Sequence, residues 1–418
     1  MNVIREKIAE GVYFSHIKTD KYKSGRLIVN LVSSVTKDNV TKRSILAAVL
    51  RQSPRSFESF SELNIELSSL YGASLYSDTA KIGDNYVLTL GSSFLNDTAL
   101  PKGVSVTNRI AEIMAGVIFN PKIENEGFKE DVLAVEKENL REAIMSEIND
   151  KRRYAVRRAI ETYFGEDGYA IPTDGYAEDL DEINGENLYK EYKELLKTAA
   201  VEIIYDGSLS PDEIKKLFAE GFSKIENRAP ISAENKAAPK KEKTVVREKS
   251  DVKQAKEVML FICPNAGTPV LKVMSALYGG TPFSFLFKEV REKQSLCYYC
   301  SSSYVRSKNM MIVESGVDNA KTEKAENEII NQFENLKKGT FTDSDLENTK
   351  QYLKSLCKTV EDAPSTYLDR YLSDMILKTE GLEKEAEKID KVTREDVISA
   401  AKETTLVGIY SLGNFDNE

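Results

Sequence analysis

The chain has 418 residues, and its 67 acidic against 58 basic side chains give a net charge of -9. An acidic excess repels phosphate backbones and anionic membrane surfaces, so nucleic acid and membrane are not expected as partners. The single histidine, His16, argues against a catalytic triad and against a catalytic zinc site, because such zinc sites usually need two or three imidazoles.

The length predicts two domains, and an apolar share of 41% is that of an ordinary globular protein. No run approaches the roughly 20 apolar residues of a membrane span. The first residues alternate charged and apolar side chains without the apolar segment of a secretory signal. We therefore expect a cytoplasmic protein.

The first half begins with an apolar run at 26–32 that predicts a strand, and a helix is expected near 43–50. Ser59 and Glu62 have the spacing of a helix N-terminal cap, and Gly72 supplies a left-handed stop. The expected elements that follow are strands at 73–79 and 85–91 and one long helical region at 126–164.

The apolar periodicity then disappears, and it returns in a second half of similar order. That half has a strand at 257–262, helices at 270–277 and 283–293, and strands at 297–304 and 310–315. The repeated order predicts a duplicated α+β unit, each a mainly antiparallel sheet covered by helices on one face. The predicted boundaries are residues 1–228 for the first domain, 229–252 for a linker and 253–418 for the second domain.

Four cysteines are too few for a disulfide framework, so reduced thiols are expected. Cys297 and Cys300 have the C-x-x-C spacing of a metal site, but they lie in a predicted strand. Because side chains alternate along a strand, the two sulfurs are expected on opposite faces, which favours a structural role.

The segment Gly279–Phe287, followed by Arg291-Glu292-Lys293 and Tyr298, resembles the C-terminal domain of the insulinase-like metallopeptidases. This is the pitrilysin or inverzincin superfamily, which includes the mitochondrial processing peptidase. The region from Phe341 to Lys350 is similar to a helix start in that domain. The duplicated layout agrees, so the resemblance covers nearly the whole chain and implies a fold that forms half of a peptidase chamber.

Active members of that superfamily carry H-x-x-E-H on an early helix, where two histidines bind zinc and the glutamate is the general base. The resemblance places this motif at Ser44-Ile45-Leu46-Ala47-Ala48, and Ser44, Ala47 and Ala48 lack all three functional groups. It places the third ligand, a glutamate of the long helix, at Glu138. Glu142, one turn further, could pair with it, although a solvated helix face is the alternative. No metal is expected in this chain.

The chain does keep Arg291 and Tyr298, which in the resembling family hold the substrate backbone in the chamber. A guanidinium and a phenol can donate hydrogen bonds to peptide carbonyls and to an oxyanion. The alternative is that Arg291 forms an ion pair with a neighbouring acidic residue and Tyr298 packs on the sheet.

The resemblance therefore implies a non-catalytic, substrate-binding subunit of a heterodimeric zinc peptidase. Zinc and the base would come from a homologous partner subunit, and the substrate would be an extended peptide. The competing hypothesis is a structural or scaffolding homologue with no role in proteolysis, which burial of Arg291 in an internal salt bridge would favour.

Overall fold

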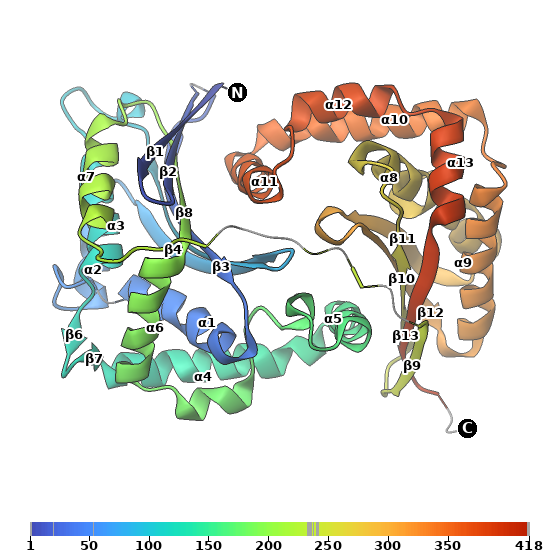
Figure 1. Cartoon of the computed structure of the whole chain (residues 1–418), viewed down its shortest axis with the longest axis horizontal. Coiled ribbons are helices and arrows are strands. Elements are labelled where there is room, and N and C mark those ends of the chain that lie inside the picture. Colours follow the sequence, from blue (N-terminus) through green and yellow to red (C-terminus); the bar gives the residue numbers. More distant parts are fainter. Residues whose placement is uncertain are drawn as a thin grey trace. The chain divides into compact units, whose positions relative to one another are not determined.

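The computed structural model describes residues 2–19, 21–52, 54–231, 236, 238–239 and 242–415, and its chain divides into two compact units. The first unit comprises Met1–Met145 and Ile171–Glu234, and the second comprises Ser146–Ala170 and Asn235–Glu418. Each unit contains one large mixed sheet with helices packed against it (Figure 1). The predicted α+β fold with two similar parts is confirmed.

The sheet of the first unit has six strands. In spatial order they are β1 (Asn2–Ala9), β2 (Val12–Lys18), β8 (Ala200–Asp206), β3 (Ser24–Ser34), β5 (Asn85–Leu95) and β4 (Ser74–Ile82). All neighbours are antiparallel except β2 and β8. The helices of this unit are α1 (Lys37–Gln52), α2 (Phe60–Ser69), α3 (Thr107–Phe119), α4 (Glu130–Ser146), α6 (Gly185–Thr198) and α7 (Asp212–Ser223), and a short hairpin joins β6 (Ile123–Glu124) to β7 (Gly127–Phe128).

The sheet of the second unit has five strands, again mainly antiparallel. In spatial order they are β9 (Thr244–Lys249), β13 (Thr405–Gly413), β10 (Gln254–Ile262), β12 (Met310–Asp318) and β11 (Cys297–Val305). The helices are α5 (Lys151–Phe164), α8 (Thr268–Ser275), α9 (Thr322–Lys337), α10 (Asp343–Thr359), α11 (Pro364–Leu377), α12 (Leu382–Asp390) and α13 (Arg394–Glu403), with π-helical segments η5 (Ala276–Gly280) and η6 (Leu286–Lys293).

The two sheets share one topology. The strands β2, β8, β3, β5 and β4 occupy the same order as β9, β13, β10, β12 and β11, and in each sheet only the first pair is parallel. This repetition is what a duplicated unit would produce. The shared order also shows that the predicted linker 229–252 is not only a connection. Its residues in β9 complete the second sheet beside β13. Residues 232–235, 237, 240 and 241 of that predicted linker lie outside the described part of the chain.

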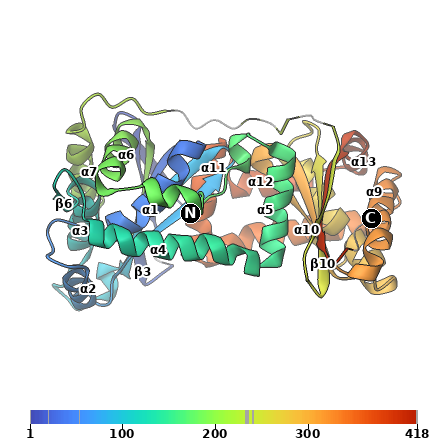
Figure 2. The ribbon, with the colours of Figure 1, turned by 90° about the horizontal axis from the view of Figure 1, so that it is seen from below.

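The long helical region expected at 126–164 is two helices (Figure 2). Asp150 separates them, because its carboxylate accepts hydrogen bonds from the backbone N–H groups of Arg152 and Arg153 and so begins α5. The second helix belongs to the second unit, whereas the predicted boundary placed every residue up to 228 in the first domain.

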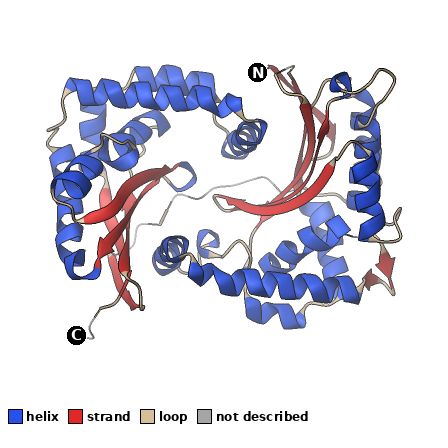
Figure 3. Ribbon diagram, turned by 180° about the vertical axis from the view of Figure 1, so that it is seen from behind, coloured by secondary structure: helices blue, strands red, loops and turns tan. Residues whose placement is uncertain are grey.

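Helices lie along one face of each sheet, as predicted (Figure 3). The second sheet is also covered on its other face, where α5 contributes Ala155, Ala159 and Tyr163 at intervals of one helical turn. These side chains pack against Val258 and Leu260 of β10. The prediction of helices on a single face is therefore incomplete for the second unit.

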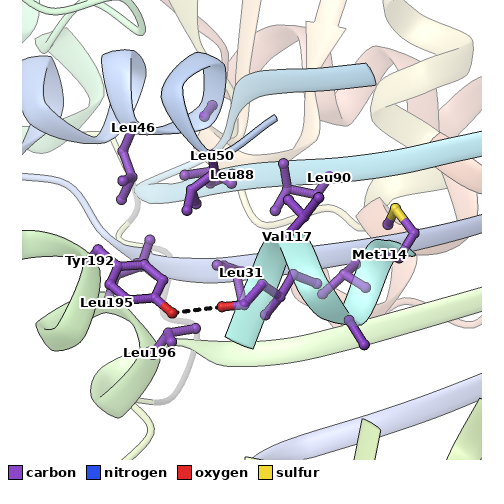
Figure 4. Close-up of a cluster of buried hydrophobic side chains, with 14 of the residues drawn as sticks. Leu31, Leu46, Leu50, Leu88, Leu90, Met114, Val117, Tyr192, Leu195 and Leu196 are labelled. Atoms are coloured by element: carbon purple, nitrogen blue, oxygen red, sulfur yellow. Dashed lines mark hydrogen bonds between the residues drawn. The ribbon is translucent and has the colours of Figure 1, made fainter. Parts of the chain in front are cut away.

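The core of the first unit lies between the sheet and its helices. Leu31, Leu88 and Leu90 of the central strands meet Leu46 of α1 and Val117 of α3 there, and all five are almost fully buried (Figure 4). Among the described residues, no helix has both the length and the apolar composition needed to cross a membrane.

Candidate functional site

The positions that the resemblance assigns to the zinc motif lie on α1, directly against the core. Ser44 is 8% exposed and Ala47 is 3% exposed, while Ala48 is half-buried. They contribute one hydroxyl and two methyl groups. A methyl group cannot coordinate a metal or accept a proton, so this turn of α1 lacks the donors that peptide hydrolysis by zinc requires.

The surroundings of this turn are occupied by protein groups. Ser44 and Thr79 place their hydroxyls beside the phenol of Tyr86, and burial raises the pKa of Tyr86. Next to Ser44, the guanidinium of Arg43 is almost fully buried and donates to Glu191 Oε1 at 2.7 Å and to the Ser33 hydroxyl at 2.8 Å. Arg43, the residue directly before the motif, therefore links α1 to α6 and β3.

Glu138, the predicted counterpart of the third ligand, does not face α1. Its side chain is 67% exposed and pairs with Arg141 on its own helix at 3.7 Å. The carboxylate of α4 that does reach α1 is that of Glu136, which is 6% exposed and accepts a hydrogen bond from the side-chain amide of Gln52. No pattern in the sequence distinguished Glu136, since neighbouring glutamates are frequent on this helix.

Within the described ranges, the structure contains no group of three or more His, Cys, Asp or Glu side chains placed to hold a metal ion. The sole histidine has its contacts away from α1. Its Nε2 lies 3.2 Å from the carbonyl oxygen of Gly207, and its ring stacks on the Tyr205 ring with 5.3 Å between the ring centres. His16 is thus a structural residue of β2.

Arg291 lies near the end of η6 and is exposed to solvent. Its guanidinium carbon is 4.8 Å from the centre of the Phe287 ring, one turn earlier on the same segment. It forms no hydrogen bond or ion pair with any other described residue. The buried salt bridge that would have favoured a scaffolding role is therefore not formed among these residues.

Tyr298 projects outward because β11 has a β-bulge at its start. Cys297 pairs with Val317 and Tyr299 with Gly316, so Tyr298 has no partner of its own in β12 and is 60% exposed. Between Arg291 and Tyr298 the backbone turns from η6 into β11, and in this turn Leu296 N–H donates to Val290 O at 3.0 Å.

The same bulge overturns the expectation for Cys297 and Cys300. An extra residue shifts the alternation by one, so both thiols face the core instead of opposite sides. A hydrogen bond from the Cys300 thiol lowers the pKa of Cys297, and that contact together with burial raises the pKa of Cys300. The geometric reason for a structural role of this pair was therefore wrong, and the role itself stays a prediction.

The two sets of predicted site residues lie in different units. Ser44, Ala47 and Ala48 share one turn of α1 in the first unit, whereas Arg291 lies near the end of η6 and Tyr298 near the start of β11 in the second unit. The latter two offer hydrogen-bond donors to solvent without competing internal acceptors. Fold and site together define an α+β protein of two similar parts in which the positions that the resemblance assigns to zinc binding carry no zinc-binding group.

Known proteins agree with this class. Residues 182–353 match the family model described as Peptidase M16 inactive domain. A Bacillus subtilis (strain 168) protein named probable inactive metalloprotease YmfF is 29% identical over 419 residues, covering 99% of this chain and 98% of that protein. The family resemblance predicted from the sequence is therefore confirmed over residues 182–353, where the chain matches the peptidase M16, or insulinase-like, family. Over its full length the chain is a homologue of a protein named as a probable inactive metalloprotease.

Solved structures show the same architecture over the full length. The crystal structure of a conserved protein from Enterococcus faecalis V583 matches with a TM-score of 0.88 at 25% identity, covering 100% of both chains. A peptidase M16 inactive domain from Pseudomonas fluorescens matches with a TM-score of 0.78 at 17% identity, again over 100% of both chains. At that lower identity the likeness establishes the fold alone.

Proposed function

We propose that this chain is the non-catalytic, substrate-binding subunit of a heterodimeric zinc peptidase. Arg291 and Tyr298 would bind the backbone of an extended peptide, and a homologous partner subunit with an intact H-x-x-E-H would supply the zinc and the general base. The observation that carries the proposal is the pair itself: both donors are exposed, and Arg291 has no hydrogen-bond or ion-pair partner among the described residues.

The chemistry of the pair fits a peptide backbone. Peptide carbonyls are acceptors, and a guanidinium and a phenol are both donors, so the two side chains can hold successive carbonyls of an extended chain. The same donors strengthen their interaction when a carbonyl develops negative charge in a tetrahedral intermediate. Such a subunit contributes to catalysis without carrying a nucleophile, base or metal.

The residue types on α1 support the proposal that binding and cleavage are carried by different subunits. Ser44, Ala47 and Ala48 cannot supply zinc ligands or a base, so any hydrolysis in which this chain takes part needs those groups from another polypeptide. The resemblance to chamber-forming peptidases makes a related zinc-bearing chain the natural source of these groups.

The decisive experiment mixes this chain with a zinc-bearing homologue from the same organism and measures peptide hydrolysis. The mixture should cleave peptides that neither chain cleaves alone. Arg291→Ala should lower kcat/KM of the mixture by about 100-fold, which is the scale of losing one oxyanion donor. Tyr298→Phe should lower it by about tenfold, since only the hydroxyl is removed.

Two matched variants test specificity. Arg153→Ala removes another exposed arginine of the second unit, and Tyr71→Phe removes the hydroxyl of another exposed tyrosine. Neither should change hydrolysis. If Arg291→Ala behaves like Arg153→Ala, or if no zinc-bearing homologue gains activity on mixing, the scaffolding alternative replaces the proposal.

A further inference from the structure

The first unit contains a cavity whose lining includes no residue of α1. It has a volume of about 570 Å³ and lies between α3, α6 and α7, with lining residues only from these helices and the segments at their ends. Its apolar lining comprises Phe119, Tyr189, Tyr192, Leu196, Leu217 and Ile225. Cavities of this size and composition are typical of small-molecule sites.

The aromatic wall of the cavity is held in place by contacts with the core. The Tyr192 hydroxyl donates to the carbonyl of Ile118 at 2.8 Å, and the Tyr189 ring stacks on Tyr192 at 5.7 Å. Phe119 meets Phe222 edge to face at 4.8 Å. Tyr192 and Leu196 belong to the same buried hydrophobic cluster as Val117 (Figure 4). The wall is therefore formed before any ligand arrives, which lowers the entropy cost of binding.

The charged lining of the cavity is mainly positive. Lys193, Lys197 and Lys224 line it, and none of their ammonium groups forms an ion pair with a described residue. Lys193 lies 4.5 Å from the centre of the Tyr189 ring. Glu220 is the one acidic lining residue, and its carboxylate lies 4.0 Å from Lys216. Three lysines against one glutamate leave an excess of two positive charges.

This local charge is opposite to that of the chain, whose net charge is -9. Unpaired lysines beside an apolar cavity attract a ligand with an anionic head, and the aromatic lining favours a hydrocarbon body. A purely apolar ligand would make no ionic contact with the lysines. A small polar anion would leave the apolar lining exposed to water.

We propose that the cavity between α3, α6 and α7 binds an anionic amphiphile of the fatty-acid type. Its acyl chain would pack on Phe119, Tyr192 and Leu217, and its carboxylate would lie among the ammonium groups of Lys193, Lys197 and Lys224. The proposal is independent of peptide binding by Arg291 and Tyr298, which belong to the other unit.

The test is a calorimetric titration of the full chain with dodecanoate below its micelle concentration, with dodecanol as the uncharged match. Dodecanoate should bind at one saturable site, and dodecanol should bind at least about tenfold more weakly. The combined substitution Lys193→Gln, Lys197→Gln and Lys224→Gln should weaken dodecanoate binding by about tenfold or more, and added salt should weaken binding to the unsubstituted chain.

A matched control removes three exposed lysines of the second unit, Lys324, Lys358 and Lys402, and so changes the net charge equally. It should bind dodecanoate like the unsubstituted chain. Leu217→Asp, which places a carboxylate in the cavity, should abolish binding while thermal unfolding shows a folded protein. Equal loss in the two lysine triples, or no saturable binding by the unsubstituted chain, would overturn the proposal.

Discussion

Tyr299 lies directly opposite Gly316 in the register of β11 and β12, and its ring covers the place where a side chain on Gly316 would stand. A Cβ atom added to Gly316 would lie 2.3 Å from Cε1 of Tyr299. The equivalent strands of the first unit repeat this pair, with Tyr76 opposite Gly91 and an added Cβ 2.3 Å from the tyrosine ring. The two sheets thus share a cross-strand contact as well as a strand order.

Gly316→Ala should destabilise the second unit by about 1 to 2 kcal/mol, because the added methyl must displace the Tyr299 ring. Arg152 adds to the cost, since its guanidinium lies 4.6 Å from the centre of that ring. Urea unfolding measures the change. In a Tyr299→Ala background the same substitution should cost much less, and an equal cost in both backgrounds would show that the ring is not the cause.

Glu257 should make stability depend on pH. It is 1% exposed, and burial raises its pKa from 4.5 to about 7, although a hydrogen bond from Ser411 opposes the rise. Between pH 4.5 and about 7 the folded chain keeps a proton that the unfolded chain has lost, so the free energy of unfolding falls as pH rises through this window. The raised pKa corresponds to about 3 kcal/mol.

Glu257→Gln should remove this loss, because an amide stays neutral at every pH. Urea unfolding at about pH 5 and about pH 8 should show a smaller difference for the variant than for the unsubstituted chain. Glu323→Gln changes an exposed glutamate of α9 and should leave the difference unaltered. If Glu257→Gln keeps the full pH dependence of stability, then other titrating groups cause that dependence.

Lys308 should anchor the segment that follows α5. The lysine is 0% exposed, its ammonium lies 3.5 Å from Asp167 Oδ1, and it donates to the carbonyl of Lys236 at 3.1 Å. The rings of Phe164 and Tyr169 lie 5.6 Å and 5.1 Å from the ammonium. Lys308→Met should destabilise the second unit by about 3 kcal/mol, since it removes a fully buried ammonium together with its ion pair and its hydrogen bond.

Limited proteolysis provides a second measurement for Lys308→Met, because loss of the anchor should expose residues 146–170 to cleavage. Lys324→Met, at an exposed position of α9, should change stability by less than about 0.5 kcal/mol. Proteolysis at an unchanged rate would mean that the apolar face of α5 alone holds the segment.

Local patterns predicted the elements well. The strand at 26–32 is the centre of β3, and Ser59 begins α2 by accepting a hydrogen bond from the Glu62 N–H at 3.2 Å. These features depend on neighbours within a few residues, which the sequence displays directly. The residue types at Ser44, Ala47 and Ala48 are equally visible in the sequence, but their correspondence to a zinc motif stays a prediction.

Features that depend on distant partners were missed. Ala155 and Tyr163 mark α5 as amphipathic, but nothing in the sequence tells which sheet covers its apolar face. The bulge at Tyr298 is a property of the pairing with β12, so the faces of Cys297 and Cys300 could not follow from alternation alone. The rotation of α4 likewise decides that Glu136 faces α1 and Glu138 faces solvent.

The difference between Glu136 and Glu138 can be tested by placing two zinc ligands on α1. The unsubstituted chain should retain well below one zinc per molecule after dialysis, measured by mass spectrometry, because Ser44 and Ala48 offer no imidazole. Ser44→His with Ala48→His places two imidazoles one turn apart on α1, and this variant should bind zinc. Adding Glu136→Gln should then weaken zinc binding by about tenfold, since the carboxylate beside α1 is lost. Adding Glu138→Gln should have no effect, because that side chain points to solvent. The reverse order of these two effects would return the third position to Glu138 and would require α4 to be rotated about its axis.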